Sequence, residues 1–126
     1  MITTQIKNNL SVVQSNGQHS ITADVPTALG GNDTGLTPHE LLEASLGACT
    51  TITVMMYAKR KQWPLKDVVT TVKILSEKGE MNEISREIKL VGDLTEVHVE
   101  KLMEIANKCP MHNFLEKKSI ITTKAV

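Results

Sequence analysis

The stretch TPHELLEASLGACTTITVMMYAKRKQWP, residues 37–64, decides the fold, because it predicts one long helix. Thr37 is suited to the N-cap, Pro38 to the first helical position, and Glu40 to the reciprocal bond of a capping box. Trp63-Pro64 marks the end of the helix, because the residue before a proline avoids helical geometry. We therefore expect about 25 helical residues in this region, at roughly 1.5 Å per residue.

Two features inside this stretch run against a helix. The β-branched run Thr50–Val54 would suit a strand on its own, but no turn residue separates it from the helical flanks. Gly47 costs a helix about 1 kcal/mol relative to alanine. Close packing of another backbone against the small residues around Gly47 would explain why a glycine stands there.

The segments on both sides of the helix predict strands. Alternating apolar residues surround Asn16-Gly17, which is typical of a two-residue hairpin turn, and residues 29–35, LGGNDTG, predict a loop. After the helix, alternation over residues 68–74 and again over residues 84–90 predicts an antiparallel hairpin.

The last third predicts two helices and a closing strand. Asp93–Glu96 reads as a second capping box, and the apolar stripe after it ends at Cys109. Pro110 begins a short helix that is expected to reach Glu116, and Ile120–Val126 is expected to close the fold as a strand. The order β-β-α-β-β-α-α-β predicts an α+β fold with a mostly antiparallel sheet, in a single domain over residues 1–126.

Composition narrows the function classes. The 14 basic and 14 acidic residues balance, and neither sign forms a long block, so we expect no nucleic-acid partner and no membrane partner. No apolar run approaches the roughly 20 residues that span a bilayer. The start of the chain lacks the pattern of a signal peptide, and the expected location is the cytoplasm.

The core is expected to be aliphatic. Only Tyr57, Trp63 and Phe114 are aromatic, and methionines such as Met56 and Met103 are expected to fill the core. A large core is harder to build from aliphatic side chains without aromatic ones. This favours a core that is shared with a second subunit. Four scattered histidines and the absence of a Cys-x-x-Cys motif predict no metal site, and we expect no cofactor.

The two cysteines are the candidate site residues, Cys49 and Cys109. Cys49 lies in the middle of the long helix among apolar residues, where a thiol is often buried and inert. Cys109 falls at the predicted N-cap of the short helix, so its sulfur would face the free N–H groups of Met111 and His112. Such a position lowers the pKa of a thiol. From the residues alone, a redox pair and two structural side chains both stay open.

Five stretches together resemble the OsmC/Ohr family of osmotically inducible and organic-hydroperoxide-resistance proteins, and more closely its OsmC-like branch. They are GGNDTGLTP at residues 30–38, LLEASLGAC at 41–49, YA at 57–58, WPL at 63–65 and CPMH at 109–112. The resemblance implies an OsmC-like α+β fold in which a mostly antiparallel sheet wraps around a long central helix. It also implies an intertwined homodimer with the two long helices packed back to back.

The resemblance further implies a thiol-dependent peroxidase. Cys49 would attack the oxygen of a small-molecule peroxide and become a sulfenic acid. Cys109 would condense with it to a disulfide, and an external dithiol would reduce that bond.

The chain departs from the peroxidase pattern in two places. Those proteins use an arginine from an N-terminal turn, whereas the only arginines here are Arg60 and Arg86. They also carry a glutamate ten residues before the attacking cysteine, where this chain has His39, and Glu40 is better explained as a cap. These departures leave an alternative: a non-catalytic protein on the same scaffold that binds a small apolar ligand or senses oxidation through a thiol.

Overall fold

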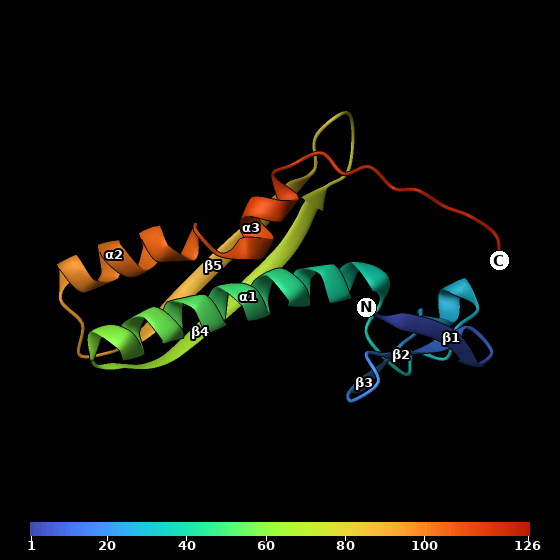
Figure 1. Ribbon diagram of the computed structural model, residues 1–126, viewed down its shortest axis with the longest axis horizontal. Coiled ribbons are helices and arrows are strands. Elements are labelled where there is room, and N and C mark those ends of the chain that lie inside the picture. The colour runs from blue at the N-terminus through green and yellow to red at the C-terminus, as the bar shows by residue number, and fades with distance from the viewer. The chain divides into compact units, whose positions relative to one another are not determined.

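The computed structural model describes residues 1–126 and has two compact units, Met1–Ala44 and Ser45–Val126 (Figure 1). The elements are β1 (Thr3–Asn8), β2 (Ser11–Ser15), β3 (Ser20–Ala23), the 3₁₀ turn η1 (Thr27–Leu29), α1 (Pro38–Lys61), β4 (Leu65–Ser76), β5 (Glu83–Gly92), α2 (Glu96–Ala106) and α3 (Pro110–Leu115). All strand pairs are antiparallel, so the α+β class and the antiparallel pairing are confirmed. A single domain over the whole chain stays a prediction.

The N-terminal unit holds a three-stranded sheet in the order β1-β2-β3. The sequence pattern predicted strands in this region but did not predict β1 as a strand separate from β2. The hairpin turn between β2 and β3 was also predicted too short, because Ser15 pairs with Ser20 and residues 16–19 form the connection. The side chain of Asn16 explains the extra length: its Oδ1 accepts from the N–H groups of Gln18 and His19 at 2.9 and 2.8 Å.

The loop after β3 is organised by Asp24, which is only 2% exposed. Its carboxylate accepts the Thr34 hydroxyl at 2.6 Å and the backbone N–H groups of Val25, Asn32 and Thr34. Gly31 lies against this cluster, and a Cβ there would overlap the carbonyl oxygen of Val25. The predicted loop is therefore a fixed turn held by one buried carboxylate.

Helix α1 has 24 residues and both predicted ends. Glu40 accepts the Thr37 N–H at 2.7 Å and Thr37 Oγ1 accepts the Glu40 N–H at 3.3 Å, so the capping box is confirmed. At the other end, Gln62 has a left-handed φ of 57°, and Trp63 N–H donates to the carbonyl of Ala58 at 2.9 Å. That pattern is the Schellman motif.

Two stripes with a spacing of four residues run along α1. One is buried and consists of Leu46, Thr50, Val54 and Ala58. The other is exposed within this chain and includes Ala48, Ile52 and Met56. By length and composition alone α1 is apolar enough to cross a membrane. The core helix of a soluble protein passes the same test.

In the second unit, α1 and α2 run beside the β4–β5 hairpin (Figure 1). The core cluster joins residues of α1, β4 and α2: Val54, Ala58, Val68, Leu102 and Ala106. Thr51 and Thr70 add a hydrogen bond of 2.8 Å between α1 and β4. A Cβ on Gly47 would lie 3.7 Å from Val72, an ordinary contact, so no close backbone approach inside this chain requires that glycine.

Helix α2 starts with a capping box, but the prediction that Asp93–Glu96 forms it was wrong. Thr95 is the N-cap, and the third helical residue is His98, whose Nδ1 accepts the Thr95 N–H at 3.3 Å. The same ring stacks on Trp63 with centroids 4.4 Å apart. His98, which has no role in the sequence analysis, therefore joins the start of α2 to the end of α1.

Two other expectations are wrong for this chain. Residues 120–126 form no strand, and Figure 1 shows this segment without an arrow. The segment has no neighbouring strand with which to pair, and a strand cannot form alone. Met56 and Met103 are 66% and 39% exposed and do not fill the core, whereas Met55 packs against it.

Candidate thiol site

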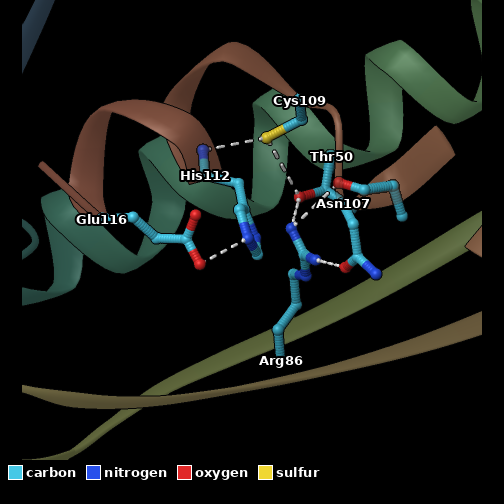
Figure 2. A network of polar contacts seen from close by, with 7 residues as sticks. Thr50, Arg86, Asn107, Cys109, His112 and Glu116 are labelled. Carbon is cyan, nitrogen blue, oxygen red and sulfur yellow. Dashed lines mark hydrogen bonds and ion pairs between the residues drawn. The ribbon is translucent and has the colours of Figure 1, made fainter. Parts of the chain in front are cut away.

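Cys109 occupies the N-cap of α3, as the sequence predicts. Its thiol is fully buried, and Sγ accepts the backbone N–H of His112 at 3.3 Å (Figure 2). Pro110 follows at the first helical position, where its fixed φ suits a helix start. The local sequence Cys-Pro-Met-His therefore holds one sulfur atom against the start of a helix.

Thr50 meets Cys109 from α1. The distance between Thr50 Oγ1 and Cys109 Sγ is 3.7 Å, and Thr50 Oγ1 also lies 2.8 Å from the carbonyl oxygen of Leu46. A hydroxyl carries one proton, so Thr50 donates to the sulfur or to the carbonyl but not to both at once. Thr50 is fully buried, and these contacts explain how a polar side chain is accommodated within the buried stripe of α1.

Arg86 reaches the same hydroxyl from β5. Its Nη1 donates to Thr50 Oγ1 at 3.0 Å and to the carbonyl of Ala106 at 3.2 Å, and its Nη2 donates to Asn107 Oδ1 at 2.8 Å. Figure 2 shows Arg86, Thr50 and Cys109 joined in a row by these contacts. The three acceptors of Arg86 are uncharged oxygen atoms, so its positive charge is not matched by a carboxylate.

Cys49 directly precedes Thr50 on α1 and is partly exposed. Its side chain is one of the groups that lower the pKa of the Cys109 thiol. Both cysteines are free thiols. The structure therefore brings the two candidate residues together inside the second unit, although they lie sixty positions apart in the sequence.

The pKa of Cys109 is lowered by its surroundings. Burial raises the pKa of this thiol, because it disfavours the charged form. That effect is outweighed by the groups around the sulfur that favour its charged form, which are the His112 N–H, the Thr50 hydroxyl, the side chain of Cys49 and the Met111 N–H. Of the two N–H donors predicted at this helix start, that of His112 is confirmed by its hydrogen bond of 3.3 Å to the sulfur.

The ring of His112 does not face the sulfur. His112 Nε2 lies 3.2 Å from Glu116 Oε1, one helical turn further along α3 (Figure 2). His112 thus contributes to the thiol through its backbone, and its side chain pairs with a carboxylate instead. No group of three or more histidine, cysteine, aspartate or glutamate side chains lies close enough to hold a metal ion.

Arg86 and Thr50 are the site residues that sequence reasoning missed. A signal for Arg86 exists in the strand pattern. Residues 84, 86, 88 and 90 share one face of β5, and Arg86 interrupts an otherwise apolar row of Ile84, Ile88 and Leu90. A charged residue at a core-facing strand position needs a polar partner, and here that partner is the thiol site.

Comparisons with known proteins agree with this fold. An OsmC like protein from Mycoplasma pneumoniae superposes with a TM-score of 0.78 at 21% identity, covering 92% of this chain and 86% of that one. An organic hydroperoxide resistance protein OsmC from Legionella pneumophila gives 0.66 at 24% identity, covering 90% and 86%. An organic hydroperoxide resistance protein from Elizabethkingia anophelis gives 0.63 at 24% identity, covering 90% and 84%.

A search of curated proteins found no match. The family model described as OsmC-like protein matches residues 30–124, which include α1, the β4–β5 hairpin and both cysteines. With most of the chain matched in this way, the protein belongs to the OsmC-like family.

Proposed function

We propose that this protein reduces small hydroperoxides with Cys49 as the attacking thiol and Cys109 as the resolving thiol. The observation that carries the proposal is the placement of the two cysteines: Cys49 directly precedes Thr50 on α1, and the Thr50 hydroxyl lies 3.7 Å from Cys109 Sγ. Two neighbours in fold, from Legionella pneumophila and Elizabethkingia anophelis, are organic hydroperoxide resistance proteins by name, which supports the same chemistry.

The difference in exposure between the two cysteines supports these roles. Cys49 is partly exposed and can meet a peroxide from solvent, whereas Cys109 is fully buried behind it. The pKa of Cys109 is lowered by its surroundings, and the side chain of Cys49 is one of the causes. Cys49 attacks as a thiolate, because the thiolate is the nucleophilic form of a thiol.

The reaction then runs in three balanced steps. The Cys49 thiolate attacks one peroxide oxygen and the O–O bond breaks, and the leaving alkoxide takes a proton from solvent, so that the products are a sulfenic acid on Cys49 and an alcohol. The Cys109 thiolate attacks the sulfenic sulfur, a proton is taken up, and water leaves as the disulfide forms. An external dithiol reduces the disulfide to two thiols and is itself oxidised.

The test is consumption of tert-butyl hydroperoxide with dithiothreitol as the reductant. We expect the wild type to consume peroxide and Cys49→Ser to lose the activity. We expect Cys109→Ser to accumulate a sulfenic acid on Cys49, which dimedone labels and mass spectrometry locates. Ala48→Ser is the matched control, because it adds the same hydroxyl to the exposed side of α1 beside Cys49.

Two outcomes would contradict the proposal. The first is a wild-type protein that consumes no peroxide. The second is a Cys49→Ser variant that is as active as Ala48→Ser. Thiols that stay unreactive in the folded protein would favour the alternative of a ligand-binding protein on this scaffold.

The proposal includes a homodimer in the cytoplasm. The exposed stripe of α1, with Ala48, Ile52 and Met56, is apolar and unpartnered within this chain, and a second copy would cover it. Reductants of the cytoplasm would keep both free cysteines reduced between turnovers.

A further inference from the structure

We propose that Arg86 is a positioning residue for the thiol pair, holding Cys109 as a thiolate through the hydroxyl of Thr50. The inference rests on the proposed function, because the thiolate of Cys109 is the group that closes the disulfide with oxidised Cys49. It assigns to β5 the cation that this chain does not carry in an N-terminal turn.

Charge is the first reason. Arg86 is partly buried, and its hydrogen bonds all end on the uncharged oxygen atoms of Thr50, Ala106 and Asn107. A guanidinium stays protonated in proteins and is costly to bury without an opposite charge nearby. The group in this cluster that can take up a negative charge is the thiol of Cys109, one hydroxyl away.

The hydroxyl of Thr50 connects the two groups. Arg86 Nη1 donates to Thr50 Oγ1 at 3.0 Å, which leaves the hydroxyl proton free to point at Cys109 Sγ, 3.7 Å away. A hydroxyl that accepts from a cation becomes a stronger donor, since hydrogen bonds in a chain polarise one another. When Cys109 is anionic, the proton of Thr50 turns from the carbonyl of Leu46 to the sulfur.

The guanidinium is fixed in this orientation from its other side. Nη1 also donates to the carbonyl of Ala106 and Nη2 to the side chain of Asn107, both within three residues of Cys109. Arg86 thus joins β5, the end of α2 and the middle of α1. A lysine has one compact ammonium group and cannot make the same forked set of bonds.

The groups that face the sulfur come from three elements. Cys49 of α1 is one of the groups that lower the pKa of Cys109, and Arg86 of β5 acts through Thr50. From α3 come the backbone N–H groups of Met111 and His112, while the ring of His112 pairs with Glu116. Arg86 therefore brings the one permanent positive charge of this cluster.

The test is an NMR titration of the Cβ signals of Cys49 and Cys109 in the intact protein, which needs no reagent to reach the buried sulfur. We expect Arg86→Gln to raise the Cys109 midpoint by about one pH unit. This is at the low end of the pKa shifts caused by a nearby opposite charge, because Arg86 contacts the sulfur only through the Thr50 hydroxyl. Lys89→Gln is the matched control: it removes the same charge from an exposed position on β5. We expect it to leave the midpoint unchanged.

Two further variants separate charge from packing. Thr50→Val keeps the shape of the side chain but removes the hydroxyl, and we expect it to raise the Cys109 midpoint as Arg86→Gln does. Arg86→Lys keeps the charge and should give a smaller shift than Arg86→Gln. If Arg86→Gln fails to fold, as judged by circular dichroism, Thr50→Val decides, because it leaves two of the Arg86 contacts in place.

The proposal would be overturned if the Cys109 midpoints of Arg86→Gln and Thr50→Val match that of Lys89→Gln. It would also be overturned if Arg86→Lys and Arg86→Gln shift the midpoint equally. Stopped-flow closure of the disulfide adds a second readout. We expect it to slow at neutral pH in Arg86→Gln and to recover at higher pH. If the Arg86→Gln and Thr50→Val variants show the expected midpoint shifts but the wild type consumes no peroxide, the proposed function is contradicted and the role of Arg86 is supported.

Discussion

At the scale of single residues, Thr50 shows how a side chain with low helix propensity becomes useful. A β-branched residue is unfavourable in the middle of a helix, and the run that includes Thr50 argued against helix in the sequence. Its hydroxyl bonds back to the carbonyl of Leu46, which is common for threonine in a helix. The same oxygen is then placed between Cys109 and Arg86.

Part of the site follows from local sequence, and part does not. Cys109 as an N-cap, with N–H groups aimed at its sulfur, could be predicted because Pro110 marks a helix start. The contacts of Arg86 with Thr50 and Asn107 span 36 and 21 positions, so they depend on tertiary packing. Local propensity holds no information about which residue an inward-facing arginine will meet.

Asp24 provides a pH-dependent prediction at this scale. The Thr34 hydroxyl is the largest cause that lowers the Asp24 pKa below its usual 3.8, and backbone N–H donors add to it. Because the folded-state pKa is depressed, the stabilisation is present above pH 3.8 and is lost as the pH falls through the lower folded value. We expect Asp24→Asn to lower the melting temperature at neutral pH and to flatten its acid dependence.

Melting curves recorded at a series of pH values check this, with Asp33→Asn as the control. Asp33 is an exposed carboxylate in the same loop, so its removal should leave the acid slope of the wild type. An Asp24→Asn protein that loses stability with acid as steeply as the wild type would refute the role of this carboxylate.

At the scale of elements, the helices that could be predicted are those whose start and stop signals lie in the local sequence. The capping box at Thr37 and Glu40, and the stop before Pro64, gave α1 within two residues. Elements that need a partner were less predictable. β1 depends on pairing with β2, and Ile120–Val126 has the composition of a strand but no neighbour to pair with.

His98 leads to a prediction about α2. Its Nδ1 accepts the Thr95 N–H, and its ring stacks on Trp63. We expect His98→Ala to lower the free energy of unfolding by about 1 kcal/mol, the usual effect of losing a cap, with a further loss from the ring contact. Urea unfolding monitored by Trp63 fluorescence measures it.

His98→Gln distinguishes the two contributions. Glutamine serves as the third residue of a capping box, so this variant should recover the part of the loss that belongs to the cap. His19→Ala, in the exposed turn before β3, is the control and should unfold like the wild type. If His98→Ala also unfolds like the wild type, the capping box contributes nothing measurable to stability.

At the scale of the whole molecule, the exposed stripe of α1 predicts the assembly state. Ile52 is 58% exposed and Met56 66% exposed on a helix whose other stripe is already buried in its own chain. We expect the wild type to be a dimer in light scattering coupled to size exclusion, and Ile52→Glu to be a monomer, because a charge cannot be buried unpaired in an apolar interface.

A control for this prediction is Val97→Glu, which puts the same charge at an exposed apolar position on α2, away from the stripe. It should remain dimeric. A wild type that is monomeric at all concentrations, or an Ile52→Glu protein that is still a dimer, would rule out this face as the interface.

The α+β class was predictable because alternation and helical periodicity are local properties of the chain. A core shared with a second subunit stays a prediction, and in the sequence only the shortage of aromatic residues favours it. The spacing of four along α1 shows why: residues 46–58 contain two apolar stripes, and nothing in the pattern says which one the chain covers for itself.

That second stripe has a consequence for the newly made protein. Until something covers Ile52 and Met56, each copy presents a strip of hydrocarbon to water. The risk of aggregation with other nascent chains is then greatest when the protein is scarce, because association with a second copy is slow. The concentration of the protein in the cell, as much as temperature, would determine the fraction of newly made chains that reach the folded state.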